Sequence, residues 1–233
     1  MPLIFFTGRV LRGDITGHWD TMDSGLTRGN RVSNSLRLLD VAGDRLAHLL
    51  SFLLHPIPVS TVLFWAFIIA GPEPAHFRRV WLVLSSLFCA ALPLSCLLVL
   101  LFRGKIFDFL LWDRRQRTGP LLAGLICYVA GTVALFATGA RRVVVVLMGC
   151  HAILAALAAL INLRWKISLH AVGACGALVA LYYCMGHRAA YLSPVAVAVA
   201  WARIRLGAHT PAQVLAGAGL GAFVTFLALE FWT

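Results

Sequence analysis

Basic and histidine side chains gather in two short segments of this 233-residue chain, and their spacing suits phosphate chemistry. Arg114 and Arg117 are three residues apart, so one turn of helix places them on the same face. Lys166 and His170 are four residues apart, with Ser168 between them, where an apolar run begins. A helix that starts there presents free backbone N–H groups and the positive end of its dipole. Both segments therefore predict contacts to an anion.

A third segment joins two short apolar stretches near the C-terminus. Arg203 ends the first of them, and His209 precedes the second by two residues. Thr210 and Pro211 have the residue types preferred at the N-cap and first position of a helix. His209 is therefore expected at the positive end of the last helix, with Gln213 one turn further on.

The three segments are separated by two apolar runs each, so hairpins should return all of them to one side of a helical bundle. Arginine forks bind phosphate oxygens in pairs, and cations stabilise the charge that builds up on a transferring phosphoryl group. One histidine can attack phosphorus while another protonates the leaving oxygen. The combination predicts an anion site with the residue types needed for phosphate-ester hydrolysis.

The order and spacing resemble the type-2 phosphatidic-acid phosphatase superfamily, which includes vanadium haloperoxidases. Its third motif is Ser-Arg, five residues, His, three residues, Asp; here Ala202-Arg203 precedes His209 and Gln213 at that spacing, with Gly217 beyond. Its second motif is Pro-Ser-Gly-His, and this chain has Ile167-Ser168-Leu169-His170. Its first motif, Lys, six residues, Arg-Pro, is matched only by the basic run 114–117 and Pro120. The similarity covers about residues 103–222.

The resemblance implies a role for each matching residue. His209 would be the nucleophile that forms a phosphohistidine, His170 the general acid, and Gln213 the partner that orients His209. No metal or other cofactor is implied. The expected phosphate-binding residues are Arg203, Arg117, Arg114, Lys166 and Ser168.

Three positions depart from the family pattern and leave a second hypothesis open. Gln213 stands in place of the Asp that stabilises the histidine cation, Ala202 lacks a hydroxyl, and Leu169 replaces a glycine. An amide can fix the histidine tautomer but supplies no negative charge. The first hypothesis is a metal-independent membrane hydrolase of a lipid phosphate or isoprenyl diphosphate. The alternative is a weak or inactive relative that binds or transports an anionic lipid or acts as a scaffold.

Composition indicates the elements that must position these residues. Hydrophobic residues make up 61% of the chain, charged residues 12%, and the mean hydropathy is +0.87. Soluble domains have about 45–50% apolar and about 25% charged residues, so an ordinary soluble fold is excluded. The apolar runs do not alternate as β-barrel strands do. The sequence predicts an all-α, polytopic transmembrane bundle of about six to seven spans.

The apolar runs divide the chain into a tail and one membrane domain. Residues 1–45 read as a polar tail ending in an interfacial amphipathic helix, capped by Ser33 or Asn34, and residues 46–233 as a single transmembrane domain. Prolines at 56, 58 and 93 are expected to bend their helices, and Gly217 and Gly221 to allow close packing. The expected spans are 46–70, 80–102, 118–140, 143–163, 167–187, 206–229 and, more weakly, 189–202.

The net charge of +11 has a one-sided distribution along these runs. With seven crossings, most Lys and Arg residues fall on the side of the N-terminus, and the positive-inside rule makes that side cytoplasmic. The expected location is the cell (inner) membrane, with the active face in the cytoplasm. The partners are the bilayer and a lipid phosphate; nucleic acid is not expected, because the cations alternate with spans. The exceptions on the opposite side are Arg78, Arg79, Arg141, Arg142 and Arg188.

A metal site is a weaker alternative near the N-terminal tail. Asp40, Asp44 and His48 are spaced four residues apart and would share one face of a helix. We interpret them as a polar stripe on an interfacial helix. The six cysteines lie in apolar runs without a paired motif and are interpreted as packing residues.

Overall fold

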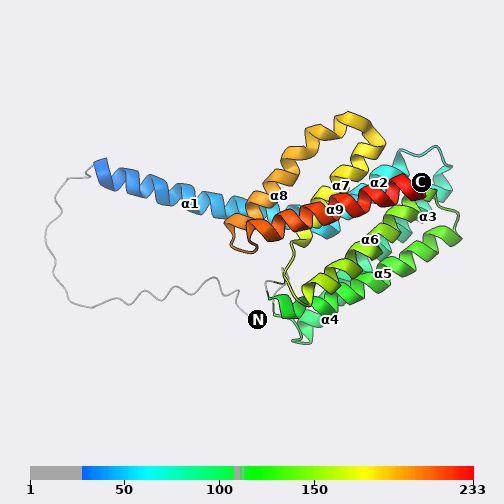
Figure 1. Cartoon of the computed structure of the whole chain (residues 1–233), viewed down its shortest axis with the longest axis horizontal. Helices are drawn as coiled ribbons and strands as arrows, with labels where there is room; N and C mark the ends of the chain where they lie inside the picture. The colour runs from blue at the N-terminus through cyan, green and yellow to red at the C-terminus, as the bar shows by residue number, and fades with distance from the viewer. Residues whose placement is uncertain (1–27, 108–110, 112) are drawn as a thin grey trace. The chain divides into compact units, whose positions relative to one another are not determined.

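The computed structural model describes residues 28–107, 111 and 113–233, and their regular structure is entirely helical (Figure 1). The chain divides into two units, residues 1–39 and 40–233. The first unit is described only over its helical stretch from Arg28, and the site lies within the second. The helices are α1 Arg28–Leu53, α2 Pro56–Ile69, α3 Ala75–Ser86, η1 Leu87–Ala91, α4 Leu92–Phe102, η2 Arg114–Arg117, α5 Thr118–Ala137, α6 Arg142–Asn162, α7 Leu169–Met185, η3 Gly186–Leu192, α8 Ser193–Arg205 and α9 Pro211–Trp232.

The polytopic all-α fold is confirmed at a coarse level. Over the described residues, five helical segments are long and apolar enough to cross a membrane, and α1 with α2 makes a sixth if the bent pair is one span. The expected seventh crossing corresponds to α8, which runs back beside α7 (Figure 1). Its thirteen residues measure about 20 Å, less than a hydrocarbon core of about 30 Å. The count of seven therefore stays a prediction.

The first helix differs from the expected boundary. It begins at Arg28, ahead of the caps expected at Ser33 or Asn34, and continues to Leu53. The predicted bend at Pro56 is confirmed: α1 and α2 meet at an angle of 49°. Pro56 cannot donate a backbone hydrogen bond into the preceding turn, so it starts a new helix. The imidazole of His55 caps that helix by accepting from the N–H of Ile57.

Helices α7 and α9 pack closely against each other, and two glycines make this close approach possible. A Cβ at Gly217 would lie 2.6 Å from the carbonyl oxygen of Ser168, and one at Gly221 would lie 2.1 Å from that of Val172. In lipid, helices associate through van der Waals packing rather than a hydrophobic driving force, so small residues at the interface matter most. The predicted glycine face is thus confirmed, and it holds the starts of α7 and α9 together.

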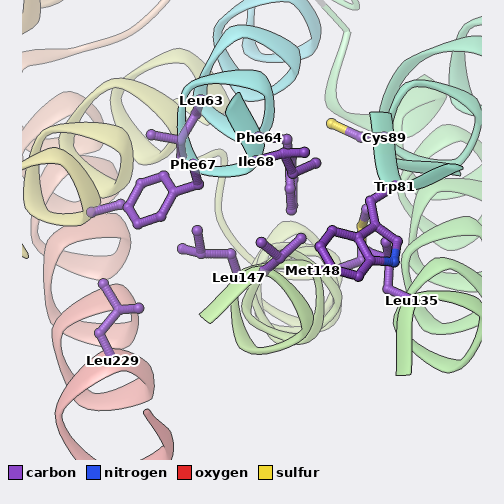
Figure 2. Close-up of a cluster of buried hydrophobic side chains, with 12 residues drawn as sticks. Leu63, Phe64, Phe67, Ile68, Trp81, Cys89, Leu135, Leu147, Met148 and Leu229 are labelled. Carbon is purple, nitrogen blue, oxygen red and sulfur yellow. The ribbon is translucent and has the colours of Figure 1, made fainter. Parts of the chain in front are cut away.

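A hydrophobic cluster fills the other end of the bundle, away from these helix starts (Figure 2). Trp81 from α3 and Leu135 from α5 pack on Met148 of α6, while Phe64 of α2 faces them. Its members are almost fully buried. Many apolar side chains point outward instead, such as Phe136, which is 75% exposed, as expected for helices that face lipid. The cluster anchors α2, α3, α5 and α6 to one another.

Candidate active site

The turn between α8 and α9 fixes the distance between Arg203 and His209. Gly207, with a φ of +64°, donates to the carbonyl of Ile204, and the N–H of Ala208 donates to the carbonyl of Arg203 at 3.1 Å. This pair of bonds is the Schellman pattern that ends helices at a glycine. The N–H of His209 also donates to the Arg203 carbonyl, at 3.2 Å. The five-residue spacing therefore corresponds to one helix ending and the next beginning.

The first turn of α9 then orients the His209 ring. Thr210 and Gln213 form a capping box, in which the Thr210 hydroxyl accepts from the Gln213 N–H and the Gln213 Oε1 accepts from the Thr210 N–H. The same Oε1 lies 3.2 Å from Nδ1 of His209. Because an amide oxygen only accepts, Nδ1 carries the proton and Nε2 is left with its lone pair. Gln213 thus contacts the His209 ring through an uncharged amide oxygen.

Arg117 meets His209 from the start of α5. Its Nη2 lies 3.5 Å from the His209 Nε2, and Arg117 as a whole is only 3% exposed. Its Nη1 donates to the carbonyl of Ile167 at 3.0 Å, and its Nε donates to that of Leu111 at 2.7 Å. These backbone contacts hold the guanidinium beside Nε2 of His209. Arg203, 1% exposed, contributes to the same electrostatic environment.

Lys166 and Ser168 hold the helix starts together. The Lys166 Nζ donates to the carbonyl of Ala208 at 2.6 Å, which ties the loop before α7 to the loop before α9. The Ser168 hydroxyl caps α7 by accepting from the N–H of Ala171, and its own N–H donates to the carbonyl of Gln213. The structure therefore brings both residues next to the His209 loop, where their side chains contact backbone atoms.

The electrostatic potential at His209 is strongly positive. Burial, and after it the nearby charges of Arg117, Lys166 and Arg203, together lower the pKa of His209 to about 3, against the hydrogen bond that Nδ1 donates to Gln213. Burial together with Arg117 and Arg203 also lowers the pKa of Lys166, opposed by Asp113. His209 is neutral at pH 7 as a result. A neutral imidazole among fixed cations is equipped to attack an anionic phosphorus centre.

His170 reaches the same region, accompanied by a histidine that sequence reasoning left out. The His170 Nε2 lies 3.0 Å from the carbonyl of Ser51 in α1 and therefore carries a proton. The ring of His55 stands edge-on to His170, with the centroids 5.2 Å apart. No acidic residue lies near His55 in the sequence, so its residue type alone does not mark it as part of a site. The sequence signal that could have pointed to His55 is its position directly before Pro56, where a helix bend is expected.

Arg114 differs from the expectation of a phosphate ligand. Its Nη1 donates to the carbonyls of Asn162 and Leu163, and the Asn162 amide returns a hydrogen bond to the Arg114 carbonyl. Arg114 therefore satisfies the open carbonyls at the end of α6. Only one arginine of the pair, Arg117, points to the site, although positions three apart share one side of a 3-10 helix such as η2. The carbonyls at the end of α6 hold the Arg114 side chain away.

Asp40, Asp44 and Asp113 could in principle supply the carboxylate that Gln213 lacks, but each has another partner. Asp40 and Asp44 form ion pairs with Arg205, at 3.3 Å and 3.0 Å. Asp113 caps η2 by accepting from the N–H of Arg115, and Asp108 lies outside the described residues. Across the described part of the chain, no three His, Cys, Asp or Glu side chains come together as a metal site. The alternative of a cation on Asp40, Asp44 and His48 therefore has no support in the geometry.

A single cavity of about 180 Å³ connects these polar groups to the interior of the bundle. Arg117, Arg203, His170 and His209 line one part of it, and the remaining lining is mostly apolar. The site is thus a charged mouth on an apolar interior. The chain matches no protein-family model, and no curated protein sequence or solved structure is detectably similar to it.

Proposed function

We propose that this chain is an integral membrane phosphatase that hydrolyses a lipid phosphate or (iso)prenyl diphosphate through a phosphohistidine on His209. One observation carries the proposal. The nucleophilic Nε2 of a neutral His209 faces the guanidinium of Arg117 at 3.5 Å, in a cavity that is otherwise mainly apolar. The sequence resemblance to type-2 phosphatidic-acid phosphatases supports the same chemistry.

In the proposed reaction, the lone pair of His209 Nε2 attacks phosphorus, and the bond to the ester oxygen breaks. Arg117 and Arg203 stabilise the charge on the remaining phosphoryl oxygens. The leaving oxygen takes the proton of the monoanionic phosphate group. Because Nε2 of His170 keeps its own proton on the Ser51 carbonyl, the unprotonated Nδ1 accepts the substrate proton and passes it to the leaving oxygen. Water then attacks the phosphohistidine, releases inorganic phosphate and restores His209.

The proposed membrane orientation follows from the distribution of cations. The ends of α4, α6 and α8 and the starts of α5, α7 and α9 carry more Lys and Arg than the opposite ends. By the positive-inside rule we assign the site to the cytoplasmic face of the cell (inner) membrane. The natural partners are then the bilayer itself and a phosphorylated lipid within it.

A second function is favoured by two specific positions. Gln213 places a neutral amide where a carboxylate would stabilise the histidine cation, and Ala202 is fully buried without a hydroxyl. The same cationic pocket would bind an anionic lipid without turning it over quickly, as a carrier or scaffold would. Turnover distinguishes the two functions.

The deciding experiment is phosphate release by purified protein in nanodiscs with EDTA present. The substrates are phosphatidic acid, a polyprenyl diphosphate and phosphatidylglycerol phosphate. His209→Ala removes the nucleophile and should abolish release. His187→Ala is the matched control, since His187 is exposed in η3 at the opposite end of α7. A ³²P-labelled substrate, quenched in base, should leave label on the wild-type protein and the control, and none on His209→Ala.

The outcomes separate the functions. Release that is lost in His209→Ala and kept in His187→Ala supports the phosphatase. Release that both variants keep contradicts the assigned nucleophile. If no substrate is cleaved while vesicles that contain phosphatidic acid still bind the folded protein, the carrier or scaffold function replaces the phosphatase.

A further inference from the structure

We infer that the apolar part of the cavity is the binding site for a single hydrocarbon chain of the substrate, with Gly124 keeping it open. This inference rests on the proposed function for the identity of the head group. The same cavity is lined by Arg117 and His209 at its charged mouth and by Tyr128 and His151 deeper in the bundle. A phosphate held by the cations would therefore direct the rest of the molecule into the protein.

The cavity extends far enough to hold a chain segment. On α6 the lining residues run from Ala158 to Leu147, and eleven residues of helix rise about 16 Å. That is about half of a hydrocarbon core of about 30 Å. On α5 the lining continues from Pro120 to Tyr128 in the same direction. With the proposed cytoplasmic orientation of the site, the cavity spans the depth of the inner leaflet, where lipid hydrocarbon chains lie.

The size and lining favour one chain. An apolar cavity of about 150 Å³ is enough to bind a benzene-sized ligand, so about 180 Å³ accepts one slender chain and excludes a second beside it. Gly124 on α5 and Ala155 and Ala158 on α6 all line the cavity, and each has a small side chain or none. A single-chain substrate, such as a monoalkyl or prenyl phosphate, therefore fits better than a diacyl lipid.

Gly124 provides the open space. It is buried, yet a Cβ built there would meet only the ring of Tyr128, at 3.6 Å, an ordinary contact. Most buried glycines of this bundle are different: a Cβ at Gly217 or Gly221 would strike a backbone carbonyl. A larger side chain at Gly124 can thus enter the cavity without forcing helices apart.

The deep end presents ring surfaces to the chain. His151 has both nitrogens engaged: Nδ1 lies 2.8 Å from the carbonyl of Leu147, and Nε2 lies 2.9 Å from the hydroxyl of Ser60. Its ring contacts those of Phe64 and Tyr128, with centroids 5.3 Å and 5.6 Å apart. With its polar atoms satisfied, His151 acts as part of an aromatic floor that limits chain length.

The test compares Gly124→Leu with Gly219→Leu. Gly219 lies on the exposed face of α9 with nothing within 4 Å of an added Cβ, so its variant gains the same side chain outside the cavity. Phosphate release is measured for butyl, octyl and dodecyl phosphate in nanodiscs. Excluding two or more methylenes should lower kcat/KM of Gly124→Leu about tenfold for dodecyl phosphate and leave butyl phosphate within about twofold. Gly219→Leu should match the wild type for all three.

A second readout does not depend on turnover. Dodecylphosphonate with a diazirine at its terminal carbon is photolysed on the protein, and labelled residues are mapped by mass spectrometry. Labels should fall on Leu147, Cys150 and Tyr128 in the wild type and Gly219→Leu, and disappear in Gly124→Leu. Labels only on lipid-facing residues, or an unchanged pattern in Gly124→Leu, would overturn the inference.

The two proposals fail separately. Cavity labelling without phosphate release retains the chain site and removes the phosphatase. Release with equal chain-length profiles in wild type and Gly124→Leu retains the phosphatase and removes the chain site. If Gly124→Leu does not fold, as judged by its thermal unfolding, Ala155→Leu repeats the test from the α6 side of the cavity.

Discussion

Replacing Gln213 with Glu tests whether a missing negative charge limits this site. The capping box accepts Glu as readily as Gln, so the carboxylate should keep the position now held by the amide oxygen. That oxygen lies 3.2 Å from Nδ1 of His209. Two unit charges at this distance attract by about 5 kcal/mol at an effective dielectric of 20, which equals roughly four pH units. Desolvation of the carboxylate opposes part of this attraction, and we expect the pKa of His209 to rise by at least ~2 units.

The assay is an NMR titration of protein labelled with ¹⁵N at its histidines, with the His209 signals assigned from His209→Asn. In the wild type, His209 has a pKa lowered to about 3 and should show no titration between pH 5 and 8. In Gln213→Glu a titration should enter or approach the lower end of that range. Ala212→Glu adds the same charge to the same helix turn at an exposed position and should leave His209 unchanged.

The catalytic consequence follows from the same charge. A carboxylate stabilises the cationic histidine formed as phosphorus is attacked, so kcat of Gln213→Glu should rise about tenfold or more at pH 7.5. Below the raised pKa, protonation removes the nucleophile and the rate should fall, whereas the wild type keeps its rate. A titration equal in Gln213→Glu and Ala212→Glu, or none in either, would refute the direct contact as the cause.

Three further predictions concern stability and assignment. Gly221→Ala should destabilise the protein by about 1–3 kcal/mol, because its Cβ would overlap a backbone carbonyl of α7, whereas Gly219→Ala should be nearly neutral in the same thermal or denaturant unfolding. Because the pKa of His209 is lowered in the folded state, the unfolded chain binds a proton near pH 6.5 that the folded chain does not. The free energy of unfolding should therefore be highest above pH 6.5 and fall by up to about 1.4 kcal/mol per pH unit as the pH drops toward 3. His209→Asn should reduce this slope when unfolding is measured as a function of pH. Arg114→Met should lower the unfolding temperature more than Arg115→Met, through the lost cap on α6, while leaving the affinity for inorganic phosphate unchanged by isothermal titration.

Much of the membrane architecture could be predicted because its determinants are local. A run of about 20 apolar residues is long enough for a bilayer whatever its neighbours are, and Pro56 ends a helix because it lacks an N–H. The start of α9 was equally readable from Thr210 and Pro211. The N-terminal boundary of α1 was harder to predict, because no residue before Ser33 clearly ends a helix, and α1 begins at Arg28.

The candidate site likewise has a part that could be predicted from local sequence and a part that could not. The spacing from Arg203 to His209 is a local property, since one glycine-terminated helix end and one capped helix start account for it. Which basic residues reach His209 depends on helices distant in sequence. Arg114 and Arg117 are equivalent in the sequence pattern, yet Arg117 lies against His209 and Arg114 binds the end of α6. His55 joins the cavity only because the bend at Pro56 brings it to His170.

The sequence alone thus determined the membrane class and the main helices, because hydrophobic length and caps act within a few residues. The direction of each side chain was decided by packing. Gly217 and Gly221 let α7 and α9 approach until their starts meet, and this approach places Ser168 against Gln213. The cavity beside Gly124 is likewise a property of several helices at once, since no single segment encloses it.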